Sequence, residues 1–144
     1  MAYEHRRVVR FDDVDFARLV YYPRLFVYCH NAFEDFFRDE VGVPYARMLQ
    51  HRGVGFPVVN ASADFRAPLR FGDPVRTVME TLRVGRRSLT NRYRLFHDER
   101  QQLCAELRIV TASISMERIV SVDLPEDVRQ AFLRHLAGAQ DKPG

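Results

Sequence analysis

The sequence predicts an α+β fold in which an antiparallel sheet wraps around one long helix. Three observations support this prediction: an amphipathic helical pattern follows Pro23, β-forming segments follow the helical region, and 144 residues suit one domain. A long amphipathic helix must bury its apolar stripe, and the face of the sheet is the large surface available to cover it. We expect one domain over residues 1–138 and a frayed tail over 139–144.

The long helix has the clearest pattern in the chain. Pro23 suits a first helical residue, and apolar side chains then recur at spacings of three and four as far as Phe37. Gly42 is the expected end of this helix. A second, short helical stretch is expected over residues 44–51, closed by Gly53.

Strand signals lie on both sides of the helical region. Residues 7–11 alternate and predict a first strand, and the β-rich segments after the helices predict an antiparallel meander. These segments are FPVVNASADFRAPL (56–69), PVRTVMETLRV (74–84), SLTNRYRLF (88–96) and QLCAELRIVTASISM (102–116), with hairpin connections expected at 71–74, 84–87 and 97–101. A strand fragment and a short helix beginning near Pro125 are expected over 120–136. Since a small open sheet exposes an edge, we expect a homodimer or a tetramer.

Composition and charge exclude several classes of protein. Apolar residues make up 47% and charged residues 28%, which excludes disorder as the main state. No apolar run is long enough to cross a bilayer, and the first residues lack the apolar core of a signal peptide, so we expect a cytoplasmic protein with no membrane partner. The net charge of +3 is scattered, so no nucleic-acid partner is expected. The histidines lack metal-ligand spacing, and Cys29 and Cys104 suit reduced thiols, so we expect no metal and no other cofactor.

The segment FDDVDFARLVYYP (11–23) connects the first expected strand to the long helix. It sets Asp12, Asp13 and Asp15 upstream of a helix N-terminus, whose free N–H groups and positive dipole end stabilise negative charge. One interpretation makes Asp12 and Asp13 solvated loop acids and Asp15 a cap or turn residue. The other gives the acids a chemical role, and the spacing alone leaves both open.

Longer motifs carry a resemblance to a known family. FxDxD followed by A-x-[LIV]-V-[YW]-Y-P, then a helix, then FPVV-x-A-x-x-D-F and a Gly-Asp turn, resembles the 4-hydroxybenzoyl-CoA thioesterase family over roughly residues 6–115. CHNAFE (29–34) with FPVVNASADF (56–65) is also similar to the 1,4-dihydroxy-2-naphthoyl-CoA hydrolase branch. The resemblance implies a hotdog fold, with a five- or six-stranded antiparallel sheet around a central helix, dimerised edge to edge. It also implies two sites at the subunit interface that hydrolyse an acyl-CoA thioester, aryl or otherwise bulky, to free acid and CoA.

The resemblance assigns the catalytic carboxylate to Asp15, the second acid of FxDxD. The thioester carbonyl oxygen is expected to accept a backbone N–H at about Tyr22, because Pro23 has none to donate. Asp15 either attacks the carbonyl carbon, giving a mixed anhydride, or takes a proton from water as general base. Where the family loop commonly carries Ala-Gly, this chain has Ala17-Arg18, so a backbone conformation that requires glycine is less favourable here.

A histidine on the long helix is a further candidate for substrate binding. His30 shares a helical face with Phe26, Phe33 and Phe37, so it meets either the core or an acyl pocket. It is interpreted as a buried, hydrogen-bonded histidine or as a pocket residue that contacts a polar group on an aromatic ring. Glu34 is expected on a solvated polar face.

The remaining candidates lie in the β-rich half. Arg86 and Arg87 occupy an expected hairpin, where they are read either as ligands of the CoA phosphates or as an exposed basic turn. Asn60 lies in a strand that we expect to be central, where it would face the thioester, and Ser62 is expected to line the sheet.

Two other function classes compete with the thioesterase. A non-catalytic module that binds acyl-CoA or acyl-carrier protein would use the same groove. A hotdog dehydratase would need a histidine and acid pair across the interface, and the sequence has no His-Phe-Pro loop to supply it. The sequence also lacks G-x-S-x-G, a P-loop and G-x-G-x-x-G, which argues against a serine hydrolase, an NTPase and a dinucleotide enzyme.

Overall fold

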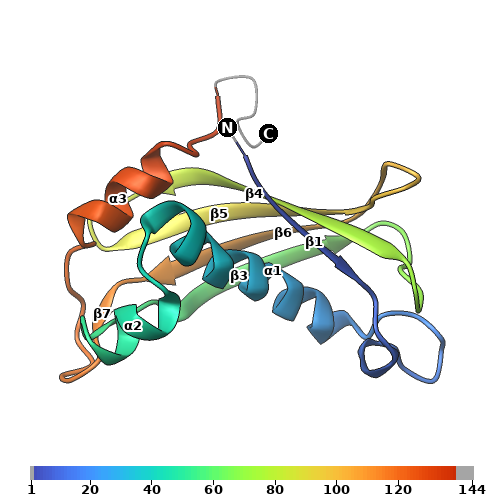
Figure 1. Cartoon of the computed structure of the whole chain (residues 1–144), viewed down its shortest axis with the longest axis horizontal. Coiled ribbons are helices and arrows are strands. Elements are labelled where there is room, and N and C mark those ends of the chain that lie inside the picture. Colours follow the sequence, from blue (N-terminus) through green and yellow to red (C-terminus); the bar gives the residue numbers. More distant parts are fainter. Residues whose placement is uncertain (1, 139–144) are drawn as a thin grey trace.

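A computed structural model describes residues 2–138, and its main element is a five-stranded antiparallel sheet. Figure 1 shows the long helix α1 lying across one face of this sheet. The strands of the sheet are β1 (Tyr3–Val8), β3 (Val58–Phe65), β4 (Pro74–Val84), β5 (Ser88–His97) and β6 (Gln102–Ala112). The helices are α1 (Tyr22–Phe36), α2 (Tyr45–Gln50) and α3 (Glu126–Leu133), and β2 (Val54–Gly55) pairs with β7 (Ile114–Ser115). One long helix against such a sheet is the hotdog arrangement, so the expected fold class is confirmed.

The strand order corrects one predicted connection. The order β1-β4-β5-β6-β3 confirms the meander from β4 to β6 and the hairpins at 84–87 and 97–101. The expected hairpin at 71–74 is wrong, because β3 pairs with β6 and lies at the opposite side of the sheet from β4. Alternation along a strand shows which face is buried but does not identify the neighbouring strand.

The connection from β3 to β4 instead crosses the end of the sheet beside the start of α1. Leu69 accepts the Val20 N–H through its carbonyl oxygen at 2.9 Å, and the Val9 N–H binds the Asp73 carbonyl oxygen at 2.9 Å. This crossing brings the segment after β3 against the loop that precedes α1.

Helix α1 continues without a break into a π-helical segment, η2 (Phe37–Val41). Gly42 ends it, as expected, with a φ of +83° and its N–H bound to the Phe37 carbonyl oxygen at 2.8 Å. This left-handed conformation suits glycine, which has no Cβ to clash. Helix α3 begins directly after Pro125, which confirms that prediction too.

The core lies between the inner face of α1 and the sheet. The buried face of the helix consists of Leu25, Tyr28, Cys29, Ala32, Phe33 and Phe36. Phe132 of α3 covers one end of it, with its ring centroid 4.4 Å from that of Phe36. Both cysteines are free and buried, as reduced thiols in an apolar pattern should be.

The first strand lies earlier in the chain than expected, at Tyr3–Val8 rather than 7–11. Its half-buried side is polar, and each polar group meets an acid. Tyr3 donates to Asp39 at 2.5 Å, and His5 lies 2.9 Å from Asp35. Because polar residues occupy the inward positions, hydrophobic alternation could not locate this strand.

Strand β3 forms one edge of the sheet and is the exposed edge on the side away from β1. Val58, Val59 and Phe65 on this strand are each more than half exposed. Asn60 therefore lies in an edge strand of the chain, and its expected central position is wrong.

In the part of the chain that the structure describes, no helix is long and apolar enough to cross a bilayer.

Candidate functional site

The loop between β1 and α1 folds back on itself as a small ladder. The Tyr21 N–H donates to the Asp13 carbonyl oxygen at 2.9 Å, Val14 bridges Val20, and the Asp15 N–H donates to Leu19 at 3.0 Å. Asp15 thus lies two rungs of this ladder from Tyr21, which immediately precedes α1.

Asp13 is fully buried, which corrects its interpretation as a solvated loop acid. Its carboxylate accepts hydrogen bonds from the Arg10 N–H at 2.9 Å, the Tyr28 hydroxyl at 2.7 Å and Arg24 Nε at 2.9 Å, and Arg7 lies 3.2 Å away. Burial by itself would raise the pKa of Asp13, but these hydrogen bonds and charges outweigh it and hold the pKa below its ordinary value. With every site of the carboxylate engaged, Asp13 has a structural role and fixes the loop against α1.

Asp15, in contrast, is exposed. Its Oδ1 accepts the Ala17 N–H at 2.8 Å, and its carbonyl oxygen accepts the Arg18 N–H at 2.9 Å. The turn interpretation of Asp15 is therefore correct as far as its backbone is concerned, and Oδ2 has no hydrogen-bond partner in the described chain. Arg18 adopts a φ of +69°, the left-handed conformation that the departure from Ala-Gly made unfavourable.

Asp15 lines a cavity of about 540 Å³ on the outer side of this loop. The other lining residues are Phe11, Val14, Phe16, Arg18 and Phe71. The rings of Phe11 and Phe71 meet edge to face with centroids 5.8 Å apart, and Phe16 is fully exposed. The Asp15 carboxylate therefore lies among aromatic side chains that are exposed to solvent in the single chain.

Helix α1 begins at Tyr22, the residue expected to supply an oxyanion donor. The Tyr22 N–H has no hydrogen-bond acceptor within residues 2–138, and Pro23 has no N–H. No acidic side chain lies in the first turn of the helix, so the positive end of its dipole is not neutralised there. This free N–H is available to an acceptor on a ligand.

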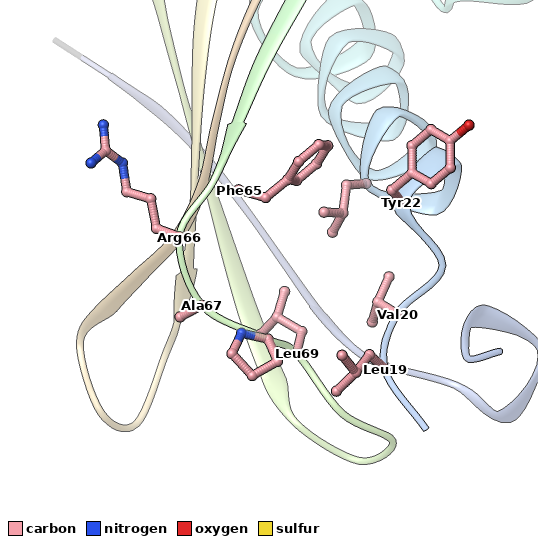
Figure 2. Close-up of a pocket in the computed structure, with 9 residues that line it drawn as sticks. Leu19, Val20, Tyr22, Phe65, Arg66, Ala67 and Leu69 are labelled. Carbon is pink, nitrogen blue, oxygen red and sulfur yellow. The ribbon is translucent and has the colours of Figure 1, made fainter. Parts of the chain in front are cut away.

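A second cavity of about 400 Å³ opens beside Tyr22, between the start of α1 and the segment that leaves β3. Leu19, Val20, Leu25, Phe65, Arg66, Ala67, Pro68 and Leu69 complete its lining. Figure 2 shows the Phe65 ring directed toward the helix, while the guanidinium of Arg66 points away. The hairpin of residues 14–20 contributes to both cavities: Asp15 and Arg18 line the first, and Leu19 and Val20 line the second.

His30 is half exposed, so its interpretation as a buried core histidine is wrong. It lies 3.3 Å from Glu34, whose side chain is also half exposed, and lines a third cavity of about 90 Å³. Phe26, Phe33, Phe56, Val58, Ala61, Tyr93, Ile109 and Thr111 line the rest of this cavity. His30 lies eight positions after Tyr22, about 12 Å along the helix, so one chain does not bring the two together.

The other expected binding residues lie apart from Asp15. Asn60 and Ser62 are exposed and alternate along β3 with Ala61, which faces the helix, so they lie on the outer face of the sheet. Arg86 and Arg87 lie in the turn after β4, and both bind Asp123, at 3.0 and 2.9 Å.

The two arginines and Asp15 are at opposite ends of the sheet. Strand β4 has 11 residues and is therefore about 36 Å long. Its first end adjoins the loop before α1, where the Gly72 N–H binds the Val9 carbonyl oxygen at 3.0 Å, and its other end leads to Arg86. Within one chain, Arg86 and Arg87 therefore cannot contact a ligand whose carbonyl group lies at Asp15.

The sequence analysis did not predict the contribution of the end of β3 and of the segment after it. Phe65, Ala67 and Leu69 line the cavity beside Tyr22, and Phe71 lines the cavity beside Asp15. The sequence carries little signal for this, because local pattern does not show that the segment after β3 crosses to the start of α1. The burial of Asp13 had a weak signal in the arginines nearby in sequence, at 6, 7, 10, 18 and 24.

Comparisons with known proteins bear on the family and the fold of this chain. Residues 9–132 match a family model described as the thioesterase-like superfamily. A 1,4-dihydroxy-2-naphthoyl-CoA hydrolase of Synechococcus elongatus is 31% identical over 105 residues, which cover 72% of this chain and 76% of that protein. A crystal structure of a 1,4-dihydroxy-2-naphthoyl-CoA thioesterase from Synechocystis superposes with a TM-score of 0.85 at 23% identity, covering 99% and 100% of the two chains. A hypothetical protein from Thermus thermophilus superposes with a TM-score of 0.83 at 32% identity, covering 96% and 100%.

Proposed function

This chain belongs to the thioesterase-like superfamily, and we propose that it hydrolyses an aryl or otherwise bulky acyl-CoA thioester to the free acid and CoA. Relatives named as CoA thioester hydrolases support the reaction class. The observation that carries the assignment of roles is the pairing of an exposed Asp15 carboxylate with the free N–H at the start of α1, on one short ladder.

The chemistry needs a donor for the oxygen of the thioester carbonyl. Attack on the carbonyl carbon gives a tetrahedral oxyanion, and the C–S bond then breaks as CoA leaves as a thiolate that takes up a proton. The Tyr22 N–H stabilises the oxyanion, with the dipole of α1 behind it. Comparable single donors in acyl-transfer enzymes are worth about 2.7–4 kcal/mol of barrier.

Asp15 supplies the attack by one of two routes. Its carboxylate adds to the carbonyl carbon and forms a mixed anhydride that water hydrolyses, or it takes the proton of a water that attacks directly. In both routes its free Oδ2 acts while Oδ1 stays bound to the Ala17 N–H, which orients the side chain.

A second copy of the chain completes the site in this proposal. A two-fold axis relates identical edge strands in antiparallel register, so pairing of β3 with its copy sets the Val58 end of one strand beside the Phe65 end of the other. Val58 lines the cavity that contains His30, and Phe65 lines the cavity beside Tyr22. The acyl group would then extend from Tyr22 of one protomer toward His30 of its partner.

The remaining assignments stay predictions of the sequence. Arg86 and Arg87 would serve the site of another copy, because the length of β4 separates them from Asp15 in their own chain. Asn60 would act through the outer face of the sheet or through the paired edge. The cytoplasmic location and the choice between a dimer and a tetramer also stay predictions.

Replacement of Asp15 by asparagine tests the proposal. Asp15→Asn keeps the size of the side chain and an oxygen that accepts the Ala17 N–H, so folding should be unchanged. We expect turnover of aryl-CoA thioesters to fall at least about 100-fold, measured by release of the CoA thiol. Asp12→Asn is the matched control, because Asp12 is an exposed acid of the same loop with its side chain 76% exposed.

The same assay separates the enzyme from the binding module. A panel of benzoyl-, hydroxybenzoyl-, dihydroxynaphthoyl- and straight-chain CoA esters is offered to the wild-type protein. Binding without thiol release would support the module, and full activity of Asp15→Asn would remove Asp15 from the mechanism.

A further inference from the structure

We propose that Arg18 binds an anionic group of the thioester substrate and so determines which thioesters reach Asp15. The inference rests on the proposed function, since it concerns recognition at the same site. The anion would be a phosphate of the CoA carrier or a carboxylate on the acyl group, because both fit the planar donor fork of a guanidinium.

The backbone at Arg18 shows that this position is held rather than free. Its φ of +69° lies in the left-handed region, which is unfavourable for a residue other than glycine. Three hydrogen bonds maintain the conformation: Arg18 N–H to the Asp15 carbonyl oxygen, Ala17 N–H to Asp15 Oδ1, and Asp15 N–H to Leu19. The bonds that fix the backbone of Arg18 are therefore the same bonds that orient Asp15, so the Arg18 side chain starts from a fixed point beside the Asp15 carboxylate.

The cavity beside Asp15 gives Arg18 its electrostatic role. Phe11, Val14, Phe16 and Phe71 are apolar, so Asp15 and Arg18 are the two charged residues of the lining. A substrate that carries phosphates or a carboxylate is repelled by the Asp15 carboxylate, and the Arg18 guanidinium is the positive group of this cavity that offsets the repulsion.

The guanidinium is available for this purpose. Arg18 is exposed, and its side chain makes no hydrogen bond or ion pair with another residue of the described chain. By contrast, Arg7 and Arg24 on the other side of the loop are engaged by the buried Asp13. A ligand that binds Arg18 does not have to displace an internal partner.

Two substitutions at this position separate charge from backbone. Arg18→Asn removes the charge and tolerates a positive φ, and Arg18→Lys keeps the charge. Three substrates separate the sources of the anion: benzoyl-CoA, S-benzoylpantetheine, which has no phosphate, and 4-carboxybenzoyl-CoA. We expect Arg18→Asn to lower kcat/KM for benzoyl-CoA or for 4-carboxybenzoyl-CoA at least about 10-fold, and Arg18→Lys to lower it less, because lysine keeps the charge but lacks the planar donor fork.

The pattern of the loss identifies the anion. If the preference for benzoyl-CoA over S-benzoylpantetheine collapses in Arg18→Asn, Arg18 binds a carrier phosphate. If that preference survives and the preference for 4-carboxybenzoyl-CoA over benzoyl-CoA collapses, Arg18 binds a carboxylate of the acyl group. If both preferences equal those of the wild type, the inference is overturned.

Two further variants serve as controls. Arg70→Asn removes an exposed arginine that precedes Phe71 but does not line the cavity, so it reports the effect of net charge alone. Ile119→Gly relieves a positive φ of +53° in a distant loop and reports the effect of backbone relief on stability. An equal loss of kcat/KM in Arg70→Asn and Arg18→Asn would contradict a specific contact.

A binding measurement separates this inference from the proposed function. Calorimetry with CoA and with terephthalate requires no hydrolysis. A wild-type protein that cleaves no thioester contradicts the proposed function, yet weaker binding of CoA or terephthalate by Arg18→Asn than by wild type would still support the role of Arg18. Equal binding by the two proteins, or no binding by the wild type, would overturn it.

Discussion

Two aspartates of one short motif have opposite environments. Asp13 is fully buried and saturated with hydrogen bonds, whereas Asp15, two residues later, is exposed and has one oxygen free. A carboxylate held by two arginines is a poor nucleophile and a poor base, because its charge is already stabilised. The motif therefore contains a structural anchor, Asp13, and a carboxylate that is free to react, Asp15.

Asp13→Asn should destabilise the fold by about 3 kcal/mol, because it leaves Arg7 near a buried site without this counter-charge and leaves Arg24 only the exposed Asp12, 3.7 Å away. Urea unfolding measures this, with Asp12→Asn as the exposed control. The lowered pKa of Asp13 adds a pH signature: its stabilisation is present above the unfolded-state pKa of about 3.9 and is lost as pH falls through the lower folded-state pKa. The wild type should lose stability below about pH 4 more steeply than the variant, and parallel pH profiles would contradict this role.

At the scale of elements, α3 completes the burial of α1. Phe132 is fully buried and its ring packs against Phe33, Phe36 and Phe37, at the junction of α1 with η2. The sequence pattern of α1 predicts an apolar stripe that continues to Phe37, and the sheet alone does not cover its last turn. Helix α3 supplies the missing surface.

Phe132→Ala should therefore lower the free energy of unfolding by about 3–5 kcal/mol, since it removes an aromatic ring from a packed cluster and leaves a cavity. Thermal and urea unfolding would both report the loss. Leu133→Ala is the matched control, because Leu133 is the next residue of α3 and is 39% exposed. Similar losses for the two variants would contradict the packing role of Phe132.

At the scale of the molecule, two features favour pairing with a second copy of the chain: the exposed edge strand β3, and the separation of the cavity at Tyr22 from the cavity at His30. Val58, Val59 and Phe65 expose apolar surface along an unpaired edge, which favours pairing with another chain. The proposed dimer covers this edge and joins the cavity at Tyr22 to the cavity at His30 of its partner.

A charge on the edge should separate the protomers. Light scattering should give about 34 kDa, twice 16.9 kDa, for a wild-type dimer, and a smaller mass for Val59→Asp at low concentration. Val8→Asp places the same charge on β1, the other edge strand, and should leave both mass and activity unchanged. If Val59→Asp becomes monomeric and keeps full thioesterase activity, the partner does not complete the site.

Short-range sequence patterns predicted much of the fold. The spacing of apolar residues after Pro23, the glycine at 42, the proline at 125 and the two true hairpins all mark features that depend on a few neighbouring residues. The motif around Asp15 and Tyr22 also lies within one short segment, and its resemblance to the thioesterase family predicted both residues. The departure from that family's Ala-Gly likewise identified Arg18 as a residue in an unfavourable backbone position.

The sequence by itself thus determined the class of fold, the helix and its ends, and the loop that carries the candidate chemistry, because each depends on interactions over one or two turns of chain. Only the tertiary structure decided that β3 pairs with β6, that Asp13 is an anchor, that His30 faces a small cavity, and that Arg86 is remote from Asp15. These facts depend on which distant segments share a surface. Alternation and spacing of apolar residues indicate which face of an element is buried, but they do not identify the segment that packs against it.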